Sequence, residues 1–261
     1  MPQAHDIDYK IYGEEMQYVE IELDPEETAV AESGAFMMMD EGIQMETIFG
    51  DGSAQPGGFM NKLFSAGKRL LTGESLFMTA YTNVGQGKKK VAFASPYPGK
   101  IIAMDMVKLQ GKLVCQKDAF LCAAKGVSVG IEFQRKLGTG LFGGEGFIMQ
   151  KLEGDGMAFV HAGGHVFMRV LQPGELLKID TGCVVAYTKN VQYDVQFVGG
   201  IKNTIFGGEG LFFATLRGPG TVWIQTLPVS RLAARILAYG TYKQKDEGSV
   251  LGGLGNLLGG R

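Results

Sequence analysis

The sequence predicts an all-β protein built from three tandem copies of one strand-rich unit. The prediction depends on an internal repeat, on alternating apolar and polar residues within each copy, and on the frequency of glycine. The 261 residues include 40 glycines, roughly twice ordinary usage, and many of these stand between short apolar runs. Glycine in such positions is typical of the tight turns of a β-sandwich or barrel.

The repeat is clearest between the second and third copies. Residues 142–146 and 206–210 both read Phe-Gly-Gly-Glu-Gly, which sets an offset of 64 positions, from 142 to 206. Residues 126–133 and 190–197 keep that offset, and both alternate apolar with polar side chains, which is the period of a half-buried strand. A more diverged first copy places residues 42–49 on the same strand, 84 positions before residue 126.

This alignment also predicts the organisation of the chain. A unit with one apolar face cannot bury that face alone, so the three copies should pack on each other. Ser230 can cap a helix that Gly240 ends. The predicted parts are an N-terminal segment at 1–17, β-repeats at 18–99, 100–165 and 166–228, an insert at 50–72 within the first repeat, and a C-terminal helix with a Gly/Leu-rich tail at 229–261.

Charge and composition argue against several classes of function. The net charge of −2 and a pI of about 6.0 lack the basic footprint of a nucleic-acid binder, so we expect no nucleic-acid partner. No apolar run reaches the length of a membrane span, and the first residues do not resemble a signal peptide. Three dispersed cysteines are too few for a disulfide framework. We therefore expect a cytoplasmic protein whose cysteines are inert core thiols.

Three glutamates occupy equivalent Gly-Glu turns in the three copies: Glu74, Glu145 and Glu209. Carboxylates related in this way can converge on a cation or a small ligand. They can equally accept hydrogen bonds from backbone N–H groups and so hold three identical turns. The structural role is favoured, because a turn used three times in one chain is more simply a folding device.

Two histidines, His161 and His165, have a spacing that can present a pair of metal ligands on one face of a helix. The Gly-Gly pair between them argues against a helix, and no third ligand is evident nearby. The favoured interpretation is a turn whose imidazoles meet backbone or solvent, with a metal site as the weaker hypothesis. We expect no cofactor.

The insert in the first repeat is the clearest departure from the internal symmetry. Phe59, Met60, Leu63 and Phe64 would share one face of a helical turn. This stripe could dock on a membrane surface or a partner protein. The favoured alternative is a short helix or loop that closes one end of the body, because apolar stripes normally face the protein's own core.

The chain resembles the family of altered inheritance of mitochondria protein 24 and its bacterial relatives. The resemblance rests on the triple repeat, on Gly-Glu-Ser-Leu-Phe at 73–77, on Phe-Gly-Gly-Glu-Gly at 206–210 and on Leu-Pro-Val-Ser-Arg-Leu at 227–232. It implies a fold like that of the tryptophan RNA-binding attenuation protein, with three short double-stranded β-helix units per chain and chains assembled as trimers. It implies no catalytic residues.

These observations lead to two hypotheses about function. The first is a non-enzymatic oligomeric β-scaffold or binding module, most simply a homotrimer, that assists a membrane-associated assembly. The alternative is a small-ligand or metal-dependent activity at the repeated Gly-Glu turns or at the His161/His165 turn. Exposed strand edges support the first hypothesis, because such edges are normally covered, charged or paired.

Overall fold

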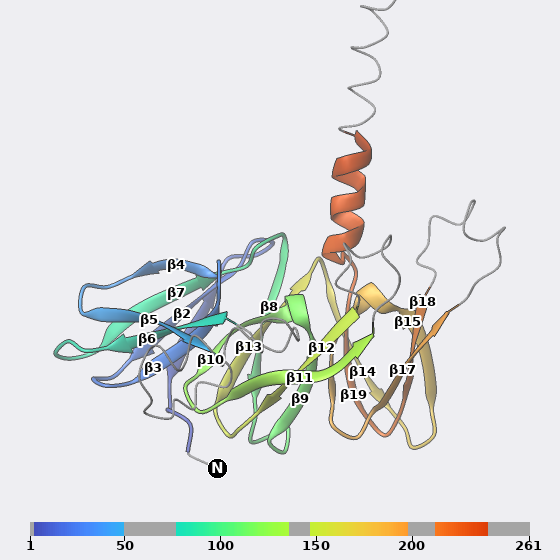
Figure 1. The fold of residues 1–261 in the computed structure, drawn as a ribbon, viewed down its shortest axis with the longest axis horizontal. Coiled ribbons are helices and arrows are strands. Elements are labelled where there is room, and N and C mark those ends of the chain that lie inside the picture. Colours follow the sequence, from blue (N-terminus) through green and yellow to red (C-terminus); the bar gives the residue numbers. More distant parts are fainter. Residues whose placement is uncertain (1–2, 50–76, 136–146, 198–211, 240–261) are drawn as a thin grey trace, which may run out of the picture.

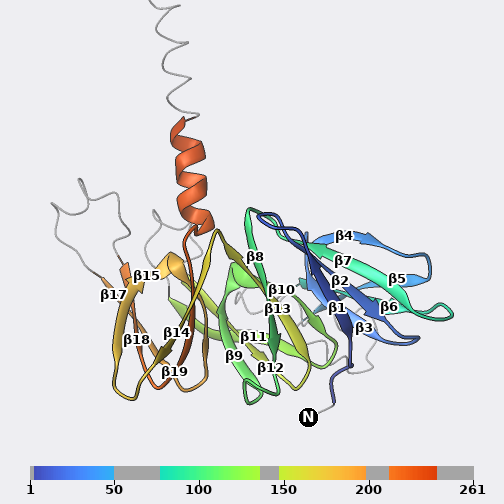
Figure 2. The ribbon, with the colours of Figure 1, turned by 180° about the vertical axis from the view of Figure 1, so that it is seen from behind.

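A computed structural model describes residues 3–49, 77–135, 147–197 and 212–239 of the chain (Figure 1). Within these ranges the chain is mostly β-strand, and one short helix at 229–239 lies near its C-terminal end. The predicted all-β class and the predicted C-terminal helix are confirmed. The strands follow one another along the long axis of the molecule, and the helix projects from the body (Figures 1 and 2).

The strands of these ranges form four antiparallel sheets, numbered first to fourth from the N-terminal end of the chain. The first sheet has the order β1 (Asp8–Tyr12), β2 (Tyr18–Leu23), β7 (Lys89–Ala94) and β4 (Phe36–Met39). The second has the order β5 (Ile43–Phe49), β6 (Phe77–Asn83), β3 (Thr28–Glu32), β10 (Phe120–Ala124), β13 (Met157–Gly163) and β8 (Gly99–Asp105).

The third sheet has the order β11 (Ser128–Arg135), β12 (Phe147–Glu153), β9 (Lys112–Gln116), β16 (Val184–Thr188), β19 (Gly220–Gln225) and β14 (Val166–Leu171). The fourth has the order β15 (Leu176–Asp180), β18 (Phe212–Arg217) and β17 (Gln192–Phe197). Two single-turn 3₁₀ helices, η1 (Lys117–Ala119) and η2 (Thr181–Cys183), precede β10 and β16.

Alternation along the strands separates the core from the surface. In β2, Val19, Ile21 and Leu23 are buried, while Glu20 and Glu22 lie between them on the opposite face. Such a pattern belongs to a strand with one face on the core. The acidic face meets the basic residues of the neighbouring strand rather than solvent alone.

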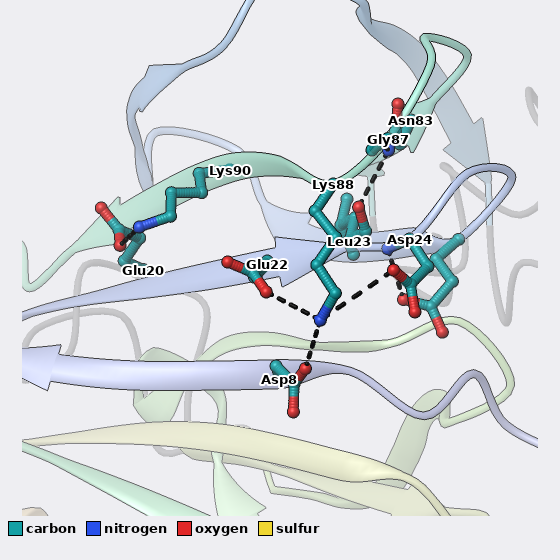
Figure 3. A network of polar contacts seen from close by, with 10 residues as sticks. Asp8, Glu20, Glu22, Leu23, Asp24, Asn83, Gly87, Lys88 and Lys90 are labelled. Carbon is teal, nitrogen blue, oxygen red and sulfur yellow. Dashed lines mark hydrogen bonds and ion pairs between the residues drawn. The ribbon is translucent and has the colours of Figure 1, made fainter.

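Two lysines of the basic cluster at 88–90, Lys88 and Lys90, form ion pairs with acidic residues of β1 and β2 (Figure 3). Lys88 Nζ lies 2.8 Å from Glu22 and 3.0 Å from Asp8, and Lys90 Nζ lies 2.7 Å from Glu20. Hydrogen bonds to Glu22 and Asp8 hold the pKa of Lys88 above its usual range. Because these lysines are half exposed, the pairs add little stability and mainly fix the pairing of β1, β2 and β7.

The strand pairing follows the offsets found in the sequence. The β4–β7, β10–β13 and β16–β19 pairs each contain a register shift, and these shifts lie at 36–38, 120–122 and 184–186. The spacing from each shift to the next equals the corresponding offset between the sequence repeats. A bulge in the same place in each pair agrees with the three predicted copies.

Two sheets pass from one predicted repeat into the next, which the sequence did not predict. In the second sheet β3 pairs with β10, with Ala31 opposite Cys122. In the third sheet β9 pairs with β16, with Cys115 opposite Ala186. Sequential copies are therefore joined by backbone hydrogen bonds as well as by packed side chains.

The N-terminal segment also joins the first two copies, since it forms strand β1 and continues past it. The Tyr9 ring packs edge-on against Phe159, with ring centroids 4.8 Å apart. The backbone N–H of Ala4 donates to Asp155 at 2.8 Å, and that of His5 donates to the Lys125 carbonyl at 2.9 Å. The N-terminal residues therefore pack against the first two copies.

We expect Gly163→Ala to destabilise the protein by about 1–3 kcal/mol, the usual range for overpacking a tight interior. A Cβ at Gly163 would overlap the Leu227 carbonyl oxygen and lie 2.9 Å from the Tyr97 ring. Urea unfolding at neutral pH measures the change. Gly130→Ala is the control, because a Cβ there meets only the flexible Lys151 side chain. Equal stability of the Gly163 variant and wild type would show that this close approach is not required.

Candidate functional site

A small cavity of about 180 Å³ lies where the first copy joins the second through the second sheet. Its ionisable lining residues are Glu32, Asp118 and His161, Ser33 is a further polar one, and its apolar walls include Ala35, Pro96, Phe120 and Leu121. The β3–β10 junction therefore brings together three ionisable side chains that are far apart in the sequence.

Each ionisable lining residue is placed by a specific local structure. Glu32 is the last residue of β3, where the strand ends in a turn. Asp118 lies in η1, the single 3₁₀ turn that connects β9 to β10. His161 lies within β13, which pairs with β10 beside the register shift. The bulge and the 3₁₀ turn together open the space that these side chains line.

His161 is 1% exposed, and its ring nitrogens have no hydrogen-bond partner of normal geometry among the described residues. Its ring meets Tyr97 edge-on, with centroids 4.3 Å apart. Burial lowers the pKa of His161 to about 4, against a smaller opposing contribution from the Tyr97 backbone. The imidazole is therefore neutral at physiological pH, with one N–H donor and one acceptor nitrogen.

Glu32 has the opposite electrostatic character. Burial and, to a smaller extent, repulsion from Asp118 raise its pKa to about 7, against an opposing contribution from the charge of Lys117. Tyr97 is affected by the same surroundings, since burial, Asp118 and Glu32 raise its pKa to about 12. The cavity therefore disfavours additional negative charge, and Glu32 changes protonation state near neutral pH.

The next junction holds the same arrangement in neutral form. Gln116 lies 84 positions after Glu32, and Gln225 lies 64 positions after His161. Gln225 is 5% exposed; it accepts a hydrogen bond from the Gly163 N–H at 2.7 Å and donates one to the Gly182 carbonyl at 2.8 Å. Its Nε2 also lies 3.5 Å from Gln116 Oε1. At this junction the buried side chain is satisfied by the protein itself.

The third equivalent position is Asp180. Its carboxylate accepts hydrogen bonds from the Gly182 N–H at 2.8 Å and from Arg231 at 3.4 Å. The three equivalent positions are Glu32, Gln116 and Asp180. Only the junction of Glu32 also contains a buried side chain, that of His161, whose ring nitrogens lack partners among the described residues. This contrast identifies the first junction as the candidate binding site.

The structure corrects the interpretation of the His161/His165 pair. His161 lies inside strand β13 and is buried, rather than in a turn with access to backbone or solvent. His165 is exposed in the following turn, where its backbone N–H donates to Thr226 Oγ1 at 2.9 Å. Across the described ranges, no group of three or more His, Cys, Asp or Glu side chains could hold a metal ion.

The other candidate residues lie outside the described residues. These are the turn glutamates Glu74, Glu145 and Glu209 and the docking residues Phe59, Met60, Leu63 and Phe64. Their proposed roles remain predictions.

The cysteines agree in part with the prediction of inert core thiols. Cys115 and Cys122 are fully buried, and burial raises the pKa of both thiols. Cys183 is partly exposed, and Arg231 Nη2 lies 3.9 Å from its sulfur. Cys183 therefore differs from the other two cysteines in both its exposure and its contacts.

We expect His161→Gln to reduce the acid sensitivity of the fold. A depressed histidine pKa gives stability that is present above about pH 6.5 and is lost as the pH falls toward 4, because the unfolded chain binds the proton more readily. Relative to wild type, the variant should therefore gain about 1–2 kcal/mol between pH 7 and pH 5. Urea titrations at both pH values measure this. A constant difference would contradict the buried neutral imidazole.

Sequence reasoning missed Glu32, Asp118 and Tyr97 as parts of a site. The sequence did contain one indication of the site. The repeat alignment places His161 over Gln225, and both are polar residues inside apolar strand runs. A polar residue at the same buried position of two copies indicates a recurring polar site.

The architecture defines a class of all-β protein in which successive strand-rich units share sheets. The chain belongs to the family described as Mitochondrial biogenesis AIM24, whose family model matches residues 9–227. This confirms the family resemblance seen in the sequence.

Two bacterial proteins are similar to the chain over most of its length. An uncharacterized protein of Streptococcus pyogenes serotype M6, M6_Spy0233, is 31% identical over 225 residues, which cover 85% of this chain and 86% of that protein. The crystal structure of SPYM3_0169 from Streptococcus pyogenes matches with a TM-score of 0.71 and 26% identity, covering 89% of this chain and 99% of that one. Among the described residues, no helix is long and apolar enough to cross a membrane.

Proposed function

We propose that the chain is a non-enzymatic β-scaffold whose copies assemble head to tail into a closed ring, most simply a homotrimer. The observation that carries this proposal concerns strands β4 and β15, which lie at the edges of the first and fourth sheets. The strands at the equivalent positions of the other copies pair with each other, β3 with β10 and β9 with β16. The scaffold acts by presenting a rigid, repeated surface for partners. In keeping with its charge and cysteine content, we place it in the cytoplasm without a nucleic-acid partner.

Among the strands that the structure describes, one edge without a partner is β4, the last strand of the first sheet. Its four residues, Phe36 to Met39, are between 39 and 47% exposed. The equivalent strand of the second copy, β10, is buried throughout because β3 lies beside it. An exposed strand of one phenylalanine and three methionines is an unusual edge, since edges of monomeric proteins are normally charged or covered.

The opposite edge is β15, which ends the fourth sheet. Its residues are exposed or partly exposed, whereas the equivalent strands β3 and β9 are largely buried beside β10 and β16. Thus β15 and β4 are the two halves of the junction that the chain makes twice internally. The same pairing between copies would cover both.

The internal junctions also predict the register between chains. Ala31 lies opposite Cys122, and Cys115 lies opposite Ala186, one pair in each junction. The residue equivalent to Ala31 and Cys115 in the third repeat is Ile179, and the residue equivalent to Cys122 and Ala186 in the first repeat is Met38. The same junction between two chains would therefore place Ile179 of one chain opposite Met38 of the next. Both are apolar, so the contact would bury apolar side chains on both sides.

The number of chains follows from the family resemblance rather than from the edges. Head-to-tail interfaces close into rings when the rotation between copies allows it, and otherwise form filaments. The resemblance implies trimers with units like those of the tryptophan RNA-binding attenuation protein, so a trimer with nine units is the proposed ring.

Size exclusion coupled to light scattering tests the proposal. At micromolar concentration the chain of 28.1 kDa should elute as one species with three times that mass. A single species with the mass of one chain would show that the edges do not associate, and a different multiple would correct only the stoichiometry.

The link to a membrane-associated assembly forms a separate part of the proposal, which depends on Phe59, Met60, Leu63 and Phe64. Replacing Phe59, Leu63 and Phe64 by serine should abolish co-sedimentation with liposomes while leaving the melting temperature unchanged. A large loss of stability would instead assign these residues to the core. The alternative function, a small-ligand or metal-dependent activity, is supported only in its small-ligand form, by the cavity around His161.

A further inference from the structure

We propose that the cavity lined by Glu32, Asp118 and His161 binds a small primary ammonium ion with a short alkyl chain. The inference concerns binding within a single chain, and so it stands or fails independently of the proposed ring. It rests on the charge, the unpaired hydrogen-bonding groups and the size of this cavity.

The charge of the cavity favours a cation. Two carboxyl groups, Glu32 and Asp118, line it, and their mutual repulsion is strong enough to outweigh the attraction of Lys117 for Glu32. His161 adds no positive charge, because its buried ring is neutral. A bound cation would relieve the repulsion between the carboxyl groups and would favour the ionised form of Glu32.

The hydrogen-bonding groups match an ammonium ion in particular. A primary ammonium carries three N–H donors and no acceptor. The cavity is lined by the carboxyl groups of Glu32 and Asp118 and by the ring of His161, whose nitrogens make no hydrogen bond of normal geometry to the described residues. An unpaired buried nitrogen costs free energy in the empty protein, and a donor from a ligand would remove that cost.

The size and the apolar walls favour an organic cation over a metal ion. A cavity of about 150 Å³ accommodates a molecule the size of benzene, so about 180 Å³ leaves room for a chain of a few carbons. Ala35, Pro96 and Phe120 supply apolar contact for that chain. The three polar groups, all within the described ranges, do not form a cluster close enough to hold a metal ion.

The second junction shows the corresponding arrangement without a binding function. Its cavity of about 210 Å³ is lined by Gln116 and Gln225 together with Lys117 and Asp118, and the buried Gln225 already bonds to Gly163 and Gly182. This junction has an amide in place of the Glu32 carboxyl, a satisfied side chain in place of His161, and a lysine beside the one carboxylate in its lining, so it attracts an ammonium ion less than the first junction does. Glu32→Gln makes the first junction resemble the second at one of its two positions.

The test uses n-butylammonium chloride as the probe, titrated at pH 8 into the full chain. The imidazole proton signals of the three histidines are followed by NMR, and His161 is assigned from the spectrum of His161→Gln. We expect a saturable shift of the His161 signal at millimolar probe. Binding should weaken at least tenfold in Glu32→Gln and several-fold in Asp118→Asn. It should also weaken at pH 5.5, where Glu32 is protonated.

Two controls separate specific binding from general salt effects. Glu46→Gln removes one exposed carboxylate on β5, away from the cavity, and should leave the titration unchanged. Sodium butyrate has a similar chain with the opposite charge and should give no saturable shift. The proposal is overturned if butyrate shifts His161 equally, if the titration does not saturate, or if folded Glu32→Gln and Asp118→Asn variants bind as wild type does.

Discussion

Replacing Glu32 by glutamine is expected to raise the free energy of unfolding by about 2–3 kcal/mol at pH 8 and by less than about 1 kcal/mol at pH 5. Burial and the proximity of Asp118 raise the pKa of Glu32 to about 7 in the folded protein. A raised carboxyl pKa gives stability that is present below the unfolded value near 4.5 and is lost as the pH rises through 7. Glutamine at this position removes that loss.

Urea unfolding of wild type and variant at both pH values measures the effect, and the comparison within each pH cancels the other titrating groups. Gln116, which occupies the equivalent position of the second copy, shows that an amide fits there. Glu46→Gln removes an exposed carboxylate and should change stability little at either pH. A Glu32→Gln effect of the same size at pH 5 and pH 8 would show that ionisation of Glu32 is not penalised.

A double substitution, Met38→Glu with Met39→Glu, is expected to convert the proposed trimer into single chains of 28.1 kDa. Both side chains are exposed in the isolated chain, so the substitution should leave the fold intact. In the proposed ring they would lie in the β4–β15 junction, where burying unpaired carboxylates costs several kcal/mol for each group. Light scattering gives the mass, and far-UV circular dichroism with a thermal melt confirms the fold.

Met45→Glu is the matched control for this experiment. Met45 is 46% exposed on β5, an edge strand that takes no part in the proposed junction. This variant should remain a trimer. An intact trimer in the Met38/Met39 variant would show that the chains associate through another surface.

Much of the fold could be predicted because its signals are local. Alternating side chains identified the strands at 126–133 and 190–197, which the structure places in β11 and β17. The pairing of β3 with β10 could not be predicted in the same way. Cross-strand pairing between copies depends on which edges meet in space, and neither strand carries a local signal for its partner.

The candidate site was only partly predictable, because its residues act through long-range contacts. Gly163 and Gly164 suggested a turn around His161, yet β13 continues to Gly163, and that glycine admits the Leu227 carbonyl to a tight contact. Glu32 looked like an ordinary acidic residue at a strand end. Its unusual pKa arises only when the second copy buries it and brings Asp118 beside it.

The sharing of sheets between successive copies has a consequence for how such proteins can evolve. If a junction within a chain and a junction between chains have the same geometry, a ring is defined by its total number of units. A ring of nine units would then close from three chains of three units, from nine chains of one unit or from a single chain of nine units, with the same diameter in each case. Covalent length and subunit number would be exchangeable only where the number of units per chain divides nine, so the gain or loss of a single unit would prevent this ring from closing.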